Sequence, residues 1–381
     1  MNILFICGSL EPGRDGVGDY TRRLAAALIN MGHIAGVVSL NDSKSDITPV
    51  NNKEYQEQDG AKVPVLRLNK HLPWKQKEVA VQQMMTEYKP DWISLQYVPY
   101  SFNSKGCPVM LGYRLSRLTK SAKWHIMIHE PFLGKTNSFK EKFIQYLQIL
   151  SVKQLFSQLK PLSVHTSLSH YANMVKQSTG KEIKLLGLFG NVPMEADYKK
   201  ESGNGKQTGI YKAVFFGSAP KKEDWSSIAD KLKIFIEDNK VKVELYIAGR
   251  LGPLGDGFCN FLEEKLYTKD TVSLFHVLGG VELDDLSKLF SNCDFGISRV
   301  PARLLGKSGT AISMLEHGLP LWIAVHEGKD DDRFLHFGKN LCFFNLSDLE
   351  KAKDYKPEFG SRLNIIGKHF LQDLQDSTSR N

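Results

Sequence analysis

The sequence predicts an α/β protein built from two doubly wound domains. Short apolar runs with the character of buried parallel strands alternate with helical patterns along both halves of the chain. The 381 residues exceed what one hydrophobic core commonly holds. A polar segment rich in glycine and lysine, 194–212, separates the halves. We therefore predict a first domain over 1–200, a second over 208–360, and an amphipathic helix over 361–381.

The predicted strands are apolar runs that end at polar residues or glycine. They are Ile3–Cys7, Ile34–Leu40, Trp92–Gln96, His125–Ile128, Leu162–Thr166, Ala213–Gly217, Val243–Ala248, Val272–Val277, Phe295–Ile297 and Leu321–Val325. The predicted helices carry apolar residues at helical spacing, and they are Asp19–Met31, Trp225–Glu237, Leu283–Phe290 and Thr310–His317. Two domains of this type are expected to bind a ligand in the cleft between them, at the carboxyl ends of the strands.

Composition and local signals exclude several classes of protein. The mixture of 41% hydrophobic and 24% charged residues is not that of a disordered, collagen-like or coiled-coil chain. No apolar run approaches the roughly 18 residues of a membrane-spanning helix, and the amino-terminal residues are typical of a buried strand, not a signal peptide. Five cysteines without a C-x-x-C pair predict neither a disulfide framework nor a metal cluster, so a cytoplasmic location is expected.

Positive charge is concentrated in one part of the chain. Residues 101–190 contain 13 Lys and Arg against 3 Asp and Glu, whereas the remaining residues contain 37 against 39. Such a segment suits nucleic acid, an anionic membrane or a phosphorylated substrate. No zinc-finger, RNP or helix-turn-helix signature accompanies it, so we predict no nucleic-acid partner. The basic, amphipathic stretch Lys140–Lys160 fits either a packed helix of the first domain or a helix on the inner face of a membrane.

Two loops are candidate anion sites. Gly16, Val17 and Gly18 lie between a strand and a helix, where backbone N–H groups approach a ligand closely; a plain turn is the alternative. The second loop precedes the helix near residue 310 and contributes Arg299, Arg303, Lys307, Ser308, Gly309 and Thr310. Ser308 is the predicted N-cap. Cations beside a positive helix end repel its dipole, so an anion such as a diphosphate is expected there; solvated surface charge is the alternative.

Further candidates follow other strands. Arg250 and Lys222 lie after two strands of the second domain and are candidates for phosphate binding. In the first domain, His129 is a candidate for holding a sugar or moving a proton, with Glu130 orienting it. Gln96 and Tyr97 suit a carbohydrate acceptor, although simple packing explains them too.

The D-x-D spacing within Asp330–Asp332 is more typical of a solvated charge run than of a metal site, so no metal ligand is predicted.

The order of these motifs resembles the retaining, nucleotide-sugar-dependent GT-B glycosyltransferases of family four, the glycogen-synthase-like group 1. The segments that carry the resemblance are Gly16–His33, Asp91–Tyr97, Ile126–Pro131, Leu188–Pro193, Tyr246–Gly252, Val277–Ser298 and Gly306–Leu321. The resemblance implies two Rossmann-like domains facing across a cleft, with the last helix crossing back to the first. It also implies that the second domain binds the donor and the first the acceptor, without a metal or other cofactor.

The resemblance also assigns roles to particular residues. His129 matches the first-domain histidine near the donor sugar, and Gly16 and Gly18 match the glycine loop beside the diphosphate. The family's Glu-x7-Glu pair falls on Leu305 and Ser313, so Glu316 is the remaining candidate for the ribose-binding carboxylate.

The resemblance predicts a retaining hexosyltransferase that uses a nucleotide diphosphate sugar and a glycan, lipid-linked or small-molecule acceptor. The missing glutamates keep a non-catalytic sugar-nucleotide or glycan-binding protein as the alternative, and a GT-B epimerase is a related one. A nicotinamide-dependent dehydrogenase is disfavoured because the chain lacks G-x-G-x-x-G.

Overall fold

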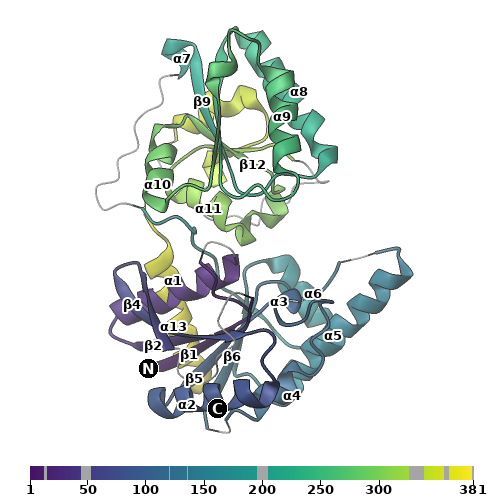
Figure 1. The fold of residues 1–381 in the computed structure, drawn as a ribbon, viewed down its shortest axis with the longest axis vertical. Helices are drawn as coiled ribbons and strands as arrows, with labels where there is room; N and C mark the ends of the chain where they lie inside the picture. The colour runs from purple at the N-terminus through teal and green to yellow at the C-terminus, as the bar shows by residue number, and fades with distance from the viewer. Residues whose placement is uncertain are drawn as a thin grey trace. The chain divides into compact units, whose positions relative to one another are not determined.

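The computed structural model describes residues 1–12, 15–43, 53–119, 121–134, 136–194, 205–325, 339–355 and 360–379. The chain divides into two compact units, Met1–Gly187 with Leu363–Asn381, and Leu188–Arg362. Each unit contains a parallel sheet with helices on both faces, which confirms the predicted α/β fold of two parallel-sheet domains (Figure 1). Among the described residues, no helix has the length and hydropathy that crossing a bilayer requires.

The first unit has an eight-stranded sheet with the order β3-β4-β2-β1-β5-β6-β7-β8. Its strands are β1 (Asn2–Cys7), β2 (Ile34–Asp42), β3 (Lys53–Gln58), β4 (Ala61–Asn69), β5 (Trp92–Tyr97), β6 (Lys123–Ile128), β7 (Ser163–Thr166) and β8 (Lys184–Leu185). Its helices are α1 (Gly16–Asn30), α2 (Trp74–Tyr88), α3 (Pro99–Phe102), α4 (Leu111–Ser116), α5 (Phe139–Leu159), α6 (Ser169–Thr179) and α13 (Leu363–Ser379). All neighbouring strands are parallel except β3 and β4.

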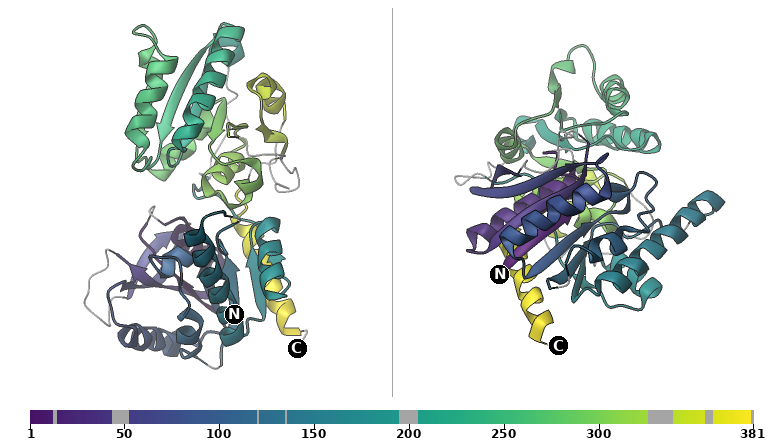
Figure 2. Two further views of the ribbon diagram at one scale, coloured as in Figure 1. Left: turned by 90° about the vertical axis from the view of Figure 1, so that its right-hand side faces the viewer. Right: turned by 60° about the horizontal axis from the view of Figure 1, so that its bottom comes forward.

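The two faces of this sheet are covered by different helices. Alternate residues of β1 point to opposite faces. Leu4 and Ile6 belong to the cluster that includes residues of α2, α4 and α5. Phe5 stacks on Phe370 of α13, with ring centroids 5.9 Å apart. Helix α13, yellow in Figure 2, therefore belongs to the hydrophobic core of the first unit, although it follows the whole second unit in the sequence.

The hairpin β3–β4 was not among the predicted strands. Its first strand, KEYQEQ, is polar and contains no apolar run, because it lies at the edge of the sheet. Asp59 and Gly60 form the turn with φ angles of 45° and 77°. An Asp-Gly pair with two positive φ angles is typical of a tight hairpin, so this dipeptide was the available sequence signal.

The second unit has a six-stranded parallel sheet with the order β11-β10-β9-β12-β13-β14. Its strands are β9 (Ile210–Phe216), β10 (Lys242–Ala248), β11 (Phe275–Gly279), β12 (Phe295–Ser298), β13 (Leu321–Ile323) and β14 (Cys342–Phe343). Its helices are α7 (Gly205–Thr208), α8 (Lys222–Asn239), α9 (Gly255–Leu266), α10 (Leu283–Asn292), α11 (Gly309–Glu316) and α12 (Leu349–Lys353), with a 3₁₀ helix, η2 (Ala302–Lys307), before α11. The strand order, 3-2-1-4-5-6 within the unit, is the doubly wound order of dinucleotide-binding folds.

The strand order places a switch point between β9 and β12. Helices α8, α9 and α12 pack on one face of the sheet, while α10 and α11 pack on the other. The connections from β9 and β12 leave the sheet in opposite directions, and ligands of open α/β sheets bind at the carboxyl ends of the strands beside this point. The predicted strand Val272–Val277 begins later, at Phe275, because 272–274 form a 3₁₀ turn.

The predicted linker 194–212 lies within the second unit, and its residues 195–204 lie outside the described part of the chain. The segment before it is held by α11. The backbone nitrogen of Asn191 donates to Ser313 Oγ at 2.8 Å, and that of Val192 donates to the same oxygen at 3.1 Å. These contacts explain why residues 188–194 belong to the second unit.

Candidate functional site

The amino terminus of α11 forms the centre of the candidate site in the second unit. Ser308 is the N-cap, as predicted, and its Oγ accepts a hydrogen bond from the backbone nitrogen of Ala311 at 3.3 Å. Thr310 Oγ1 lies 3.1 Å from Ser308 Oγ, so two hydroxyl groups meet at the first turn. The remaining backbone N–H groups of this turn have the polarity that anions favour.

Three basic residues precede this helix end. Arg299 is exposed directly after β12, and Arg303 and Lys307 are half-buried on η2. Lys307 is the residue immediately before the N-cap. Because the helix dipole is positive at this end, a neighbouring cation is unfavourable unless an anion lies between them. The anion site and the roles of the three cations therefore stay predictions.

At the carboxyl edge of the sheet, a glycine lies beside the first turn of α11. Gly217 follows β9 with φ of 120°, and a Cβ atom there would lie 3.4 Å from Thr310 Cγ2. The backbone nitrogen of Ala219 donates to Leu251 O at 2.9 Å and links the loop after β9 to the loop after β10. Arg250 is exposed in this second loop. Lys222 begins α8, and its Nζ lies 5.9 Å from the centroid of the Trp225 ring.

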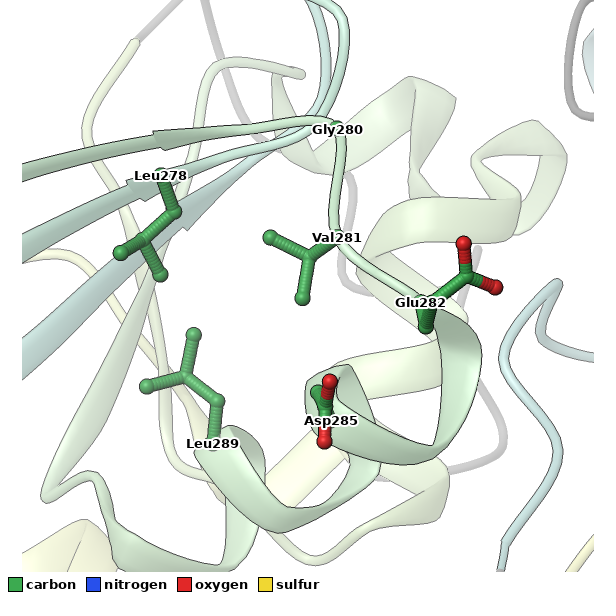
Figure 3. A pocket seen from close by; sticks show the side chains of 6 residues that line it. All are labelled: Leu278, Gly280, Val281, Glu282, Asp285 and Leu289. Carbon is green, nitrogen blue, oxygen red and sulfur yellow. The ribbon is translucent and has the colours of Figure 1, made fainter.

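A pocket of about 530 Å³ opens at the same carboxyl edge, beside β11 and α10. Its apolar walls are Leu278, Val281 and Leu289, which face a common hollow in Figure 3. Glu282 and Asp285 are its acidic members. The negative charge makes the pocket unsuitable for a phosphate group, whereas apolar walls with a few acceptors suit a ring system that carries donors. Sequence reasoning did not single out these residues, because a lining formed by three apolar side chains has no local motif.

Glu316 takes a structural position instead of the expected ribose-binding one. It is the last residue of α11, and the distance from Ser308 along the helix is roughly 12 Å at 1.5 Å per residue. Its side chain is 1% exposed, and its Oε1 accepts a hydrogen bond from the backbone nitrogen of Arg362 at 3.0 Å. We therefore revise the prediction: Glu316 fixes the chain where the second unit ends.

The first unit places His129 and Gln96 together. His129 follows β6, and its Nε2 lies 2.9 Å from Oε1 of Gln96 on β5. The ring also meets Tyr20 of α1 edge-on, with centroids 5.0 Å apart. Burial lowers the pKa of His129 to about 3, so the ring is neutral near pH 7. A neutral imidazole that donates through Nε2 keeps Nδ1 as a hydrogen-bond acceptor.

Two neighbours of this pair differ from their predicted roles. The orienting partner of His129 is the Gln96 amide, whereas Glu130 is exposed. Tyr97 points to the opposite face of β5 and is fully buried, stacked on Phe102 with centroids 6.2 Å apart. Its hydroxyl has no hydrogen-bond partner among the described residues, and burial raises the pKa of this group. Tyr97 therefore belongs to the core and is not presented to an acceptor.

The glycine loop of the first unit already contains an anion. The carboxylate of Asp15, the N-cap of α1, accepts hydrogen bonds from the backbone nitrogens of Val17 at 2.9 Å and Gly18 at 3.0 Å. A Cβ atom on Gly18 would lie 2.4 Å from Ser9 O, so glycine is needed there for close packing. We therefore revise the prediction for the amides of Val17 and Gly18, which this carboxylate occupies in place of a ligand phosphate, whereas the role of Gly16 stays a prediction. An Asp directly before a helix was the sequence signal for this cap.

Asp42, at the end of β2, also holds this loop. It is fully buried and accepts hydrogen bonds from Ser9 Oγ at 2.7 Å, from the backbone nitrogen of Leu10 at 3.2 Å and from Arg67 Nε at 3.1 Å. A carboxylate at the end of the second strand can bind ribose in dinucleotide-binding folds. Here its oxygens stabilise the first loop.

No cluster of His, Cys, Asp or Glu that could hold a metal ion occurs in the described ranges. The Asp330–Asp332 spacing lies outside those ranges. The prediction that catalysis needs no metal therefore stays a prediction.

Solved structures resemble this architecture over nearly the whole chain. The UDP-GlcNAc 2-epimerase from Methanocaldococcus jannaschii matches with a TM-score of 0.56 at 11% identity, covering 98% of this chain and 99% of its own. HepE from Anabaena, solved with UDP and glucose, matches with a TM-score of 0.57 at 13% identity, covering 99% and 100%. The UDP-forming trehalose-phosphate synthase from Burkholderia vietnamiensis matches with a TM-score of 0.54 at 10% identity, covering 99% and 94%.

The chain has the GT-B fold. No protein-family model matches the sequence, and no curated protein matches it either. At identities of 8–13%, the structural likeness establishes the GT-B architecture and leaves the chemistry to the residues of the site.

Proposed function

We propose that this GT-B protein binds a nucleotide diphosphate sugar and transfers its hexose, with retention, to a hydroxyl group of a glycan, lipid-linked or small-molecule acceptor. The observation that carries the proposal is the placement of Arg303 and Lys307 directly before the amino terminus of α11. A diphosphate bound here accepts hydrogen bonds from the first turn and contacts these cations, with the hydroxyls of Ser308 and Thr310 beside it.

The acidic pocket beside β11 and α10 suits the nucleoside end of the donor. Strands β11 and β9 are separated by one strand, so their ends lie roughly 10 Å apart. The diphosphate then occupies the basic helix end, and the base lies between Leu278, Val281 and Leu289. Carboxylates at the rim, Glu282 and Asp285, are acceptors for base N–H or ribose hydroxyl groups.

In the reaction, the bond between the anomeric carbon and the diphosphate oxygen breaks. An acceptor hydroxyl forms a bond to the same face of that carbon, and its proton passes to the leaving diphosphate. Lys307, Arg303, Arg250 and the N–H groups of α11 stabilise the negative charge that develops on the diphosphate. On the first unit, the neutral ring of His129, held by the Gln96 amide, offers Nδ1 as an acceptor for a sugar hydroxyl.

A sugar-nucleotide-binding protein without turnover is the second candidate. This candidate is favoured by the two residues that stand where the resemblance to family-four glycosyltransferases expects glutamates. Leu305 is buried in the core, and Ser313 accepts hydrogen bonds from the backbone of Asn191 and Val192. Neither residue presents a carboxylate to a ligand.

Calorimetry and turnover assays separate these candidates. The protein is titrated with UDP, GDP and ADP, and then incubated with the corresponding hexose donors while nucleoside diphosphate release is followed. We expect saturable binding of one nucleoside diphosphate and release that depends on an added acceptor. Binding without release over hours supports the second candidate, an epimerised donor identifies an isomerase, and absence of binding contradicts both candidates.

A further inference from the structure

Helix α5 has apolar side chains on two faces, and the described residues cover only one of these faces. Val152, Leu155, Phe156 and Leu159 pack into the core of the first unit. Phe139, Phe143, Tyr146 and Leu150, which we name the α5 ridge, are 91%, 63%, 63% and 38% exposed. Their spacing of four, three and four residues places them along one side of the helix. The first half of α5 projects from the rest of the unit (Figures 1 and 2).

The α5 ridge is accompanied by positive charge. Lys140 and Lys142 are exposed beside it, and Lys142 Nζ lies 5.7 Å from the centroid of the Phe139 ring. The segment 101–190 that contains the ridge has 13 basic and 3 acidic residues. Projecting aromatic side chains flanked by lysines fit the headgroup region of a membrane that contains anionic lipids. A protein partner would need a groove that accommodates the ridge.

We propose that the α5 ridge docks the protein on a membrane that contains anionic lipids. The aromatic side chains insert between the headgroups, and the lysines bind the lipid phosphates. This inference does not depend on the proposed donor site, because the ridge and α11 belong to different units.

Vesicle sedimentation with the full chain tests the proposal. We expect binding to vesicles of phosphatidylcholine with phosphatidylglycerol, little binding to phosphatidylcholine alone, and loss of binding as salt rises. The double substitution Phe139→Ser and Phe143→Ser is expected to weaken binding by about tenfold or more. Ile234→Ser, at a position 56% exposed on α8 of the second unit, is the matched control.

Several outcomes would overturn the membrane proposal. They are absence of binding to anionic vesicles, equal binding of the double variant and the wild-type chain, or a monomer–dimer equilibrium that the double variant abolishes while vesicles have no effect. The substituted residues are exposed, so thermal melting should report an intact fold for all three proteins.

A second inference rests on a different feature, a buried chain of hydrogen bonds that runs from His129 to α13. Gln96 Nε2 donates to Ser94 Oγ at 2.7 Å, and Ser94 Oγ lies 2.8 Å from His125 Nδ1. His125 Nε2 lies 2.9 Å from His165 Nδ1, and His165 Nε2 lies 2.9 Å from Asp373 Oδ2. With the contact between Gln96 and His129, the chain connects β5, β6, β7 and α13.

The far end of the chain sets its direction. The hydrogen bond from His165, together with Lys184 Nζ at 2.5 Å, keeps the pKa of Asp373 below its usual range, so its carboxylate can only accept. His165 Nε2 must therefore donate. Burial keeps the pKa of His125 well below its usual value, so this ring is neutral and has one donor and one acceptor nitrogen. A His165 ring with a single proton, on Nε2, accepts at Nδ1, and donation then runs from Gln96 through Ser94, His125 and His165 to Asp373.

We infer that this chain orients the Gln96 amide so that its Oε1 faces His129 and selects the Nε2–H tautomer of that ring. Gln96, Ser94, His125, His165 and Asp373 are thus positioning residues, and His129 Nδ1 is the acceptor offered to a ligand. The use of Nδ1 for a sugar hydroxyl rests on the proposed function, whereas the tautomer does not.

Long-range ¹H–¹⁵N correlation spectra of ¹⁵N-histidine-labelled protein test the tautomer without any donor. We expect the Nε2–H pattern for His129, assigned by its loss in His129→Gln. Gln96→Met and Asp373→Asn should each shift the ¹⁵N resonances of His129, and Asp376→Asn on the same helix should leave them unchanged. An Nδ1–H pattern in the wild-type chain, or unchanged resonances in Asp373→Asn, would overturn the inference. If the spectra are as expected but the protein transfers no sugar, the proposed function is contradicted and the inference about the tautomer stands.

Discussion

Ser313 Oγ lies 2.8 Å from the backbone nitrogen of Asn191 and accepts its hydrogen bond. The same oxygen accepts from Val192 and donates to Gly309 O at 2.7 Å. Ser313 is fully buried at the position where the resemblance to family-four glycosyltransferases expects a glutamate. The side chain thus stabilises the entry of the chain into the second unit.

The substitution Ser313→Ala should therefore lower stability. It leaves the backbone N–H of Val192 without its acceptor and that of Asn191 with only the longer hydrogen bond to Gly309 O at 3.4 Å, which costs about 1–3 kcal/mol. Urea unfolding measures the change. Ser226→Ala, at an exposed position on α8, should change the unfolding free energy by less than about 0.5 kcal/mol. Equal effects of the two substitutions would contradict the structural role of Ser313.

Removing the cation before the α11 N-cap should weaken ligand binding. Lys307→Ala is expected to raise the Kd for the preferred nucleoside diphosphate by about tenfold or more, because a charge-assisted contact to phosphate is lost. Calorimetry measures the change. The control is Lys233→Ala, at an exposed position on α8 where the lysine Nζ lies 3.9 Å from Glu237 Oε1. An unchanged Kd in Lys307→Ala would show that the diphosphate does not bind at this helix end.

The lowered pKa values of two buried histidines predict that the protein loses stability in mild acid. Burial lowers the pKa of His129 to about 3 and that of His125 well below 6.5. As pH falls below about 6.5, the unfolded chain binds protons that the folded chain does not, so the unfolding free energy decreases. Each histidine contributes about 1.4 kcal/mol per pH unit between its unfolded and folded pKa values.

Urea unfolding at pH 6.5 and pH 5 measures this slope. His129→Gln should remove the contribution of one histidine, whereas the same substitution at His369, exposed on α13, should not. A slope that His129→Gln leaves intact would show that the ring binds a proton in the folded protein.

Close packing of the first loop predicts a cost for a methyl group at Gly18. A Cβ atom there would lie 2.4 Å from Ser9 O, so Gly18→Ala should destabilise the chain by about 1–3 kcal/mol. A Cβ atom on Gly134 meets nothing within 4 Å, and Gly134→Ala should be near neutral. Thermal melting of the two variants compares them, and equal melting temperatures would refute the packing argument.

The N-cap of α11 was predictable because its signal is local. A serine followed by an apolar helical pattern predicts an N-cap, and the cations of Arg303 and Lys307 lie within the residues just before it. The glycine loop shows the limit of such reasoning. The same sequence fits a phosphate loop or a loop closed by its own carboxylate, and the contacts of Asp15 decide between them.

The sequence by itself determined the alternation of strands and helices, and with it the two doubly wound sheets, because strand and helix periodicity is written in neighbouring residues. Only the tertiary structure decided which buried polar groups meet. His165 and Asp373 are 208 residues apart in the chain and 2.9 Å apart in the fold. Such partners depend on how α13 packs against the sheet, and packing follows from shape and burial over the whole unit, which no local pattern encodes.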